Sequence, residues 1–253
     1  MVPGIQGRWE WMKPGIDALS TRCRVITYSL ADEPSCAGQF DEKTGFACYV
    51  EQVREAMDEA GVERATICGV SYGGLIAAAF AARYPARVSG LVLLSALPPS
   101  WKPDARVRLY LRAPRLLMPV FMLSSLRMYR EIAAAHPGAW AGVREASRHG
   151  WNVLMHMFSP IRMARRVHLI TRADLGGFQR LRVPALIITG DAGLDRVVPV
   201  HLTREYLQWL PHARFETVER TGHLGFITRP EVFADLVAPF AAANTAGSRR
   251  RIG

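Results

Sequence analysis

The sequence predicts an α/β fold, in which a mostly parallel sheet carries helices on both faces and a helical insertion interrupts the chain. Short, almost continuously apolar segments alternate with helix-like segments, which is typical of strands buried on both faces. The alternation stops at residue 98 and resumes at residue 183. The chain has 253 residues, of which 49% are hydrophobic, and this is enough for one substantial core.

The first part of the chain supplies three predicted strands and two predicted helices. Apolar or β-branched runs at residues 24–29, 65–70 and 88–95 predict the strands. Residues 44–60 carry apolar side chains at helical spacing and end at Gly61, a typical C-terminal stop. Residues 72–84 are small and apolar, and this second helix must end before a proline.

The insertion, residues 98–182, is rich in Arg, Met, Leu and Trp and contains no clear strand, so we expect several short helices. We therefore divide the chain into a core, residues 1–97 and 183–253, and a helical cap, residues 98–182. In the second part of the core we expect strands at 184–190 and 214–218, helices at 202–210 and 232–243, and a frayed tail at 247–251.

The formal net charge is +10, which raises the question of a nucleic-acid or anionic-membrane partner. The insertion holds fifteen Lys and Arg against four Asp and Glu, so it carries the whole excess. No nucleic-acid-binding motif accompanies it, and we expect no nucleic-acid partner. Two interpretations remain: a solvated basic surface, or a cap that attracts acidic substrates or anionic lipid.

The cysteines and the apolar runs indicate the cellular compartment in which we expect the protein. Cys23, Cys36, Cys48 and Cys68 form no C-x-x-C pair and no cluster with histidine, so we expect reduced thiols and no metal site. The first residues lack the apolar segment of a secretory signal, and no apolar run approaches the roughly 18–20 residues that span a bilayer. We expect a cytoplasmic protein without an integral membrane segment.

A G-x-S-x-G motif lies between a predicted strand and a predicted helix. The letters GVSYGG, residues 69–74, place Ser71 at this strand-to-helix turn, which is the context of a nucleophile elbow. Gly69 and Gly73 lack side chains and let neighbouring backbone pass close by. The start of the following helix favours negative charge at the site. We therefore expect Ser71 to be a nucleophile.

A serine nucleophile needs a base, and the base needs an acid. His223 follows the last predicted strand, at the same edge of the sheet as Ser71. The loop after residues 184–190 offers two carboxylates, Asp191 and Asp195, of which we favour Asp195. The chain order Ser, Asp, His is the one expected of this kind of hydrolase.

With these motifs, the chain resembles the α/β-hydrolase superfamily, specifically members with a helical cap after the sixth strand. GVSYGG, GDAGLDRVVP and ERTGHLGF are similar to the family's elbow, acid loop and histidine loop, and DRVVP resembles its D-x-x-V-P, which supports Asp195. PGIQG, residues 3–7, resembles the oxyanion loop H-G-x-x-G, with Pro3 in place of histidine. The resemblance implies an oxyanion hole formed by the backbone N–H groups of Ile5 and Tyr72.

The resemblance also implies that N-terminal strands are missing. In the family the oxyanion loop follows a central strand, which here would pair with both residues 24–29 and residues 65–70. Without it, two rows of backbone groups lack partners. Two explanations stay open: the recorded start lies downstream of the true one, or the strands are lost and leave an unstable or inactive remnant.

The expected reaction is hydrolysis of a carboxylic ester or related acyl substrate through an acyl-enzyme, without any metal or organic cofactor. An apolar, Met-rich cap suits an apolar acyl group, and Trp9, Trp11 and Trp151 are candidate substrate contacts. The same triad also serves acyl transfer, thioester cleavage or carbon–carbon bond hydrolysis. Dehalogenase and epoxide-hydrolase chemistry, which uses an aspartate nucleophile, is excluded by Ser71. A non-catalytic ligand-binding protein is the alternative from another class.

Overall fold

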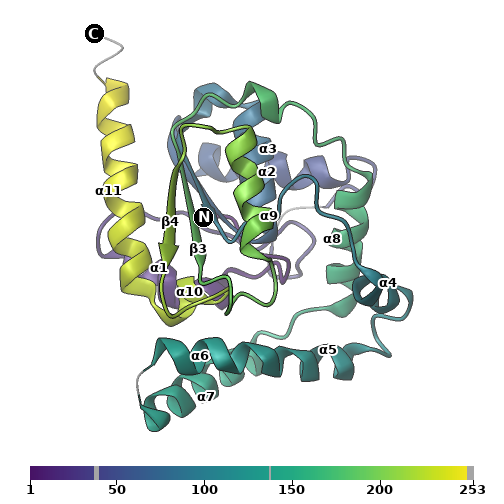
Figure 1. Cartoon of the computed structure of the whole chain (residues 1–253). Coiled ribbons are helices and arrows are strands. Elements are labelled where there is room, and N and C mark those ends of the chain that lie inside the picture. The colour runs from purple at the N-terminus through teal and green to yellow at the C-terminus, as the bar shows by residue number, and fades with distance from the viewer. Residues whose placement is uncertain (37–39, 137, 250–253) are drawn as a thin grey trace.

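A computed structural model describes residues 1–36, 40–136 and 138–249. At its centre lies a four-stranded sheet with the strand order β1-β2-β3-β4 (Figure 1). All three neighbouring pairs are parallel, which confirms the predicted α/β class. The strands are β1 Ala65–Val70, β2 Val88–Leu94, β3 Ala185–Gly190 and β4 Arg214–Val218.

Apolar side chains bury both faces of this sheet. In β2, Leu91 and Leu93 belong to one apolar cluster, whereas Val92 and Leu94 belong to a second. This alternation is the period of two that places successive strand residues on opposite faces. The first cluster contains residues of α2 Phe46–Glu59, α3 Tyr72–Arg83 and the 3₁₀ segment Glu205–Gln208, which follows α9 Val200–Arg204. The second contains residues of α1 Lys13–Ser20, α10 Gly225–Thr228 and α11 Pro230–Arg249.

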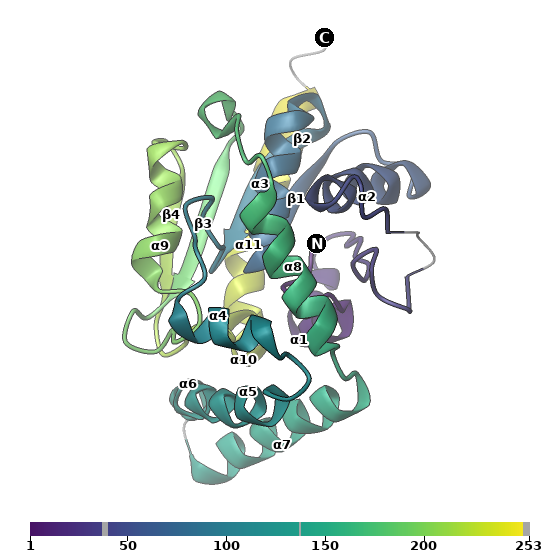
Figure 2. The ribbon, with the colours of Figure 1, turned by 90° about the vertical axis from the view of Figure 1, so that its right-hand side faces the viewer.

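The insertion between β2 and β3 consists of helices and the loops that join them. Asp104 and Ser159 cap the first and last of its α-helices, each accepting a hydrogen bond from a backbone N–H of the first turn. Figure 1 shows α6 and α7 beyond the ends toward which the arrows of β3 and β4 point, which are the carboxyl ends of the strands. Figure 2 shows α8 running back along the core. The α-helices are α4 Ala105–Arg112, α5 Met118–Ser124, α6 Tyr129–Ala135, α7 Ala139–Met155 and α8 Pro160–Arg172.

The predicted strand at residues 24–29 is wrong, since the segment forms no strand. It lies beside the first two residues of the chain: the Met1 ammonium donates to the Ile26 carbonyl at 2.7 Å. On the other side of Met1, Val2 bridges β1, donating to Cys68 O at 2.8 Å and accepting from Val70 N at 3.2 Å. Residues 1–2 therefore lie between residues 24–29 and β1, where the resemblance places a central strand. Two residues are too few to supply a ladder of hydrogen bonds.

The other differences mainly concern helices, since β2 and β3 are each only one residue shorter than predicted. Helix α1, with a proline in its first turn, was not predicted. The helix expected at 202–210 is instead α9 followed by a 3₁₀ segment, Glu205–Gln208. The last helix, α11, continues through Arg249, so the expectation of a frayed tail is wrong for residues 247–249. Residues 250 and 251 lie outside the described part of the chain.

Candidate active site

Ser71 occupies a sharp turn between β1 and α3. Its backbone has φ 55° and ψ −117°, a conformation that L-residues rarely adopt. The turn is tied to the end of β2, because Ser71 N donates to Leu94 O at 2.8 Å and Leu97 N donates to Ser71 O at 3.1 Å. Ser71 is thus held at the carboxyl edge of the sheet.

Two glycines make this turn possible. A Cβ on Gly69 would lie 2.2 Å from Gly73 O, and a Cβ on Gly73 would lie 2.3 Å from Val2 O. Real Cβ atoms do not approach backbone atoms so closely, so both positions require glycine. The first and last glycines of G-x-S-x-G therefore have the physical role that the sequence motif indicates.

His223 and Asp195 contact each other at the same edge. His223 Nδ1 lies 3.3 Å from Asp195 Oδ2. The other oxygen of Asp195 accepts hydrogen bonds from Val197 N and Val198 N, both at 2.9 Å. Asp191 has a different partner, since its Oδ2 accepts from Arg220 N at 2.6 Å. The structure thus brings Asp195, rather than Asp191, to the histidine.

Burial and charge act in opposite directions on this pair. Burial lowers the pKa of His223, but the charge and hydrogen bond of Asp195, together with the charge of Glu131, hold it above the usual histidine value. Burial raises the pKa of Asp195, but His223 and the two amides hold it below the usual value. Both shifts favour an ionised aspartate beside a histidine that binds a proton readily.

Ser71 and His223 follow strands of the same parallel sheet. The histidine loop is fastened to the end of β3, because Asp191 N donates to Thr221 O at 2.7 Å. Ser95, at the end of β2, donates its amide to Ile188 of β3 at 2.9 Å. No hydrogen bond between Ser71 Oγ and His223 is present among the described residues, and such bonds are often long in unliganded enzymes.

The loop expected to form the oxyanion hole lies beside Ser71. A Cβ on Gly4 would be 3.7 Å from Ser71 Cβ, so a single added carbon would bring the loop into van der Waals contact with the serine. Gly7 N donates to Gly4 O at 2.9 Å and closes the turn around Ile5. Tyr72 is the first residue of α3, where backbone N–H groups have no partner within the helix.

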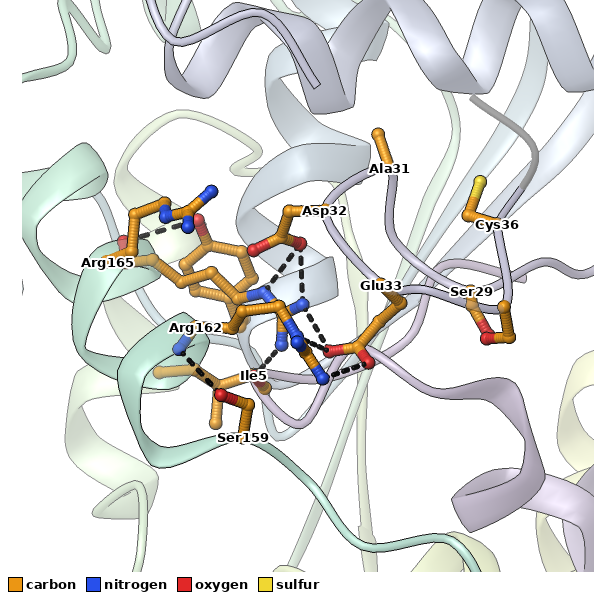
Figure 3. Close-up of polar contacts among 12 residues, drawn as sticks. Ile5, Ser29, Ala31, Asp32, Glu33, Cys36, Ser159, Arg162 and Arg165 are labelled. Carbon is orange, nitrogen blue, oxygen red and sulfur yellow. Dashed lines mark hydrogen bonds and ion pairs between the residues drawn. The ribbon is translucent and has the colours of Figure 1, made fainter. Parts of the chain in front are cut away.

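A buried ionic cluster supports this loop from the side of the insertion (Figure 3). The fully buried Arg166 side chain of α8 donates to Ile5 O at 2.7 Å, to Asp32 Oδ1 and to Glu33 Oε1 at 2.7 Å. Arg162 makes two further bonds of 3.0 Å to Glu33. The cluster therefore joins α8, residues 32–33 and the loop beside Ser71.

Sequence reasoning missed this cluster. The signal was the spacing of Arg162, Arg165 and Arg166, which places three guanidinium groups on neighbouring positions of one helix. The matching acids lie more than a hundred residues earlier, and only folding brings them together. Part of the positive charge of the insertion is consequently neutralised in pairs with the core.

The three candidate tryptophans differ in their surroundings. Trp9 packs against the second apolar cluster. Trp11 donates its Nε1 to His156 O at 2.9 Å and meets the ring of Phe158 edge-on, so it joins the N-terminal segment to the insertion. Trp151 is 64% exposed on α7. Its role in substrate binding remains a prediction.

Two surface cavities have volumes of about 400 and 630 Å³: the smaller lies along α8, and the larger is lined mainly by residues of α2, α3 and the segment that follows α8. Neither is lined by Ser71, Asp195 or His223. Within residues 1–36, 40–136 and 138–249, no cluster of three or more His, Cys, Asp or Glu residues has the arrangement of a metal site. Over the same described ranges, no helix combines the length and apolarity needed to cross a membrane.

Comparisons with known proteins agree on one family. The sequence profile described as "Alpha/beta hydrolase family" matches residues 1–236. A "Putative carbamate hydrolase RutD" from Caulobacter sp. (strain K31) is 24% identical over 247 residues, 96% of this chain and 90% of the relative. A 2-hydroxymuconate semialdehyde hydrolase from Pseudomonas putida is 28% identical over 208 residues, 80% of this chain and 71% of the relative. The crystal structure of an enol-lactonase from Burkholderia xenovorans LB400 has the same fold, with a TM-score of 0.73 and 23% identity over 94% of this chain and 88% of that chain.

Proposed function

Because the chain belongs to the alpha/beta hydrolase family, we propose that it is a serine hydrolase acting on a carboxylic ester or a related acyl substrate. One observation carries the proposal: the His223–Asp195 contact of 3.3 Å lies at the sheet edge where Ser71 occupies its strained turn. A nucleophile, a base and an orienting acid are the parts that acyl transfer to water requires.

In the proposed reaction, Ser71 Oγ attacks the substrate carbonyl while His223 takes the hydroxyl proton. The negative charge that develops on the carbonyl oxygen is stabilised by the N–H groups of Ile5 and Tyr72. His223 then gives the proton to the leaving group, and an acyl-enzyme remains. Water, activated by the same histidine, attacks the acyl-enzyme and restores Ser71. Asp195 orients His223 and stabilises its charged form, and no cofactor takes part.

The substrate class follows from the carbonyl chemistry and the surroundings of the site. The relatives are named for a carbamate, a semialdehyde and an enol-lactone, so substrates differ widely within this similarity. We propose that residues 98–182 act as a cap over Ser71 and that their apolar side chains favour an apolar acyl group. Trp11 lies where the N-terminal segment meets this cap, whereas Trp9 packs against the second apolar cluster of the core.

A fluorophosphonate probe tests the proposal, because it reacts covalently with an activated serine. We expect the wild-type protein and Ser89→Ala to be labelled and to hydrolyse p-nitrophenyl esters, whereas Ser71→Ala is neither labelled nor active. Ser89 is a matched control, since it is a buried serine near the opposite end of β2. Labelling that persists in Ser71→Ala would contradict the assignment of the nucleophile.

A further inference from the structure

Glu131, a carboxylate of the insertion, lies against the loop that carries His223. Glu131 lies on α6 and is only 1% exposed. A glutamate is almost never so fully buried unless its carboxylate has partners. A single oxygen, Oε1, accepts three hydrogen bonds: from Gly222 N at 2.7 Å, from Leu224 N at 2.6 Å and from Thr221 Oγ1 at 3.2 Å. Two of these donors are the backbone amides immediately before and after His223.

A second contact joins the same two elements. Arg220 donates its Nε to Ala134 O, near the end of α6, at 3.0 Å. Arg220 itself has φ 61°, so the histidine loop begins with a backbone conformation that non-glycine residues seldom adopt. Helix α6 therefore holds this loop through both a side chain and a main-chain carbonyl.

A carboxylate has a physical advantage at this position. The amides of Gly222 and Leu224 point into the interface with the insertion, where an unpaired N–H is costly. One ionised oxygen can accept from several donors, and bonds to a charged acceptor are stronger than neutral ones. The same charge adds to that of Asp195 in the field around His223, whereas Arg127 of the insertion opposes both.

We infer that Glu131 is a positioning residue that fixes the base His223 by clamping the backbone on both sides of it to α6. The insertion then does more than cover the site, because its docking sets the orientation of the imidazole. This inference rests on the proposed serine hydrolase function. Glu131 acts through the backbone that flanks His223, and Asp195 is the direct partner of the imidazole.

Two substitutions separate hydrogen bonding from charge. Glu131→Gln keeps an amide oxygen that can accept from Gly222 and Leu224, and we expect kcat within roughly tenfold of wild type. The acid side of its pH–rate profile should move to lower pH, because His223 loses a neighbouring negative charge. Glu131→Ala removes the acceptor, and we expect kcat to fall roughly tenfold to hundredfold with little change in KM.

Asp174→Asn is the charge-matched control within the insertion. Its carboxylate bonds to Gly176 N, and we expect an unchanged pH–rate profile. Circular dichroism at the assay temperature checks whether Glu131→Ala is folded. If Glu131→Ala does not fold, the pH–rate profile of Glu131→Gln provides the test. A wild-type kcat in a folded Glu131→Ala, an unchanged pH–rate profile in Glu131→Gln, or equal losses in the two variants would overturn the inference. Failure of the proposed function is a separate result, since it would leave Ser71→Ala active.

Discussion

At the scale of single residues, the candidate site is a charged pair whose two pKa shifts reinforce each other. The pKa of His223 is raised and that of Asp195 is lowered, in both cases against a burial effect of opposite sign. In the proposed reaction, His223 must be neutral to accept the proton of Ser71. Activity should therefore decline as the pH falls through the raised pKa of His223, at higher pH than for an ordinary histidine, whose pKa is about 6.5.

Asp195→Asn should lower kcat about 10⁴-fold, the size of loss seen when the orienting acid of a serine–histidine pair is neutralised. The pKa of His223 should fall, because it loses its main negative neighbour, so the remaining activity should extend to lower pH. Steady-state pH–rate profiles measure both effects.

Asp191→Asn distinguishes the two candidate acids. Asp191 bonds to Arg220 N and not to His223, so its variant should keep most of the activity and the acid limb of wild type. A loss in Asp191→Asn as large as that in Asp195→Asn would contradict the geometry of the acid loop.

At the scale of elements, the elbow at Ser71 depends on how closely β1, α3 and the first residues of the chain approach one another. The strand at 65–70 was predicted with the observed ends, because an apolar run bounded by polar residues specifies a buried strand locally. The strand at 214–218 was also predicted with the observed ends, although it lies at the edge of the sheet and only Val218 in it is buried. Residues 24–29 have the same kind of composition but form no strand. A strand also requires a partner, and composition alone does not reveal one.

Gly73→Ala should destabilise the protein by about 1–3 kcal/mol or more and abolish most activity. The added Cβ would lie 2.3 Å from Val2 O and 2.4 Å from Pro3 O, which are backbone atoms of the loop beside Ser71. Urea unfolding and ester hydrolysis measure the two effects.

Gly150→Ala is the control for Gly73→Ala. Gly150 lies in α7, and a Cβ added there would meet nothing within 4 Å outside its own helix, so alanine should be tolerated and should stabilise the helix by about 1 kcal/mol. A Gly73→Ala protein as stable and active as wild type would show that the loop does not approach the elbow as closely as the structure has it.

At the scale of the whole molecule, the insertion and the core are joined by buried polar contacts on two sides of the site. Glu131 reaches the histidine loop, and Arg166 reaches the loop of Ile5. Burial lowers the pKa of Arg166, but Asp32 and Glu33 more than offset this, and the guanidinium stays charged. The insertion thus contacts both loops that would complete the chemistry of Ser71.

Arg166→Met should destabilise the protein by about 3–5 kcal/mol, because Asp32 and Glu33 would keep their buried charges with fewer partners. Arg165→Met is the matched control: its side chain is 36% exposed and its guanidinium lies 3.9 Å from the Glu42 carboxylate, so the change in stability should stay within about 1 kcal/mol. Denaturant unfolding of both variants decides the prediction, and equal stability of the two would contradict a buried ionic cluster.

The sequence by itself determined the α/β class and located the four strands of the sheet, and it identified Ser71, Asp195 and His223 as candidates. These follow from local apolar patterns and from short motifs whose glycines meet local steric needs. Only the tertiary structure decided which acid meets His223, and only it revealed Glu131 and Arg166. Glu131 and Arg166 contact backbone groups 93 and 161 residues away in the chain. A local pattern does not reveal such partners, because the energy of these pairs arises only when folding removes both groups from water together.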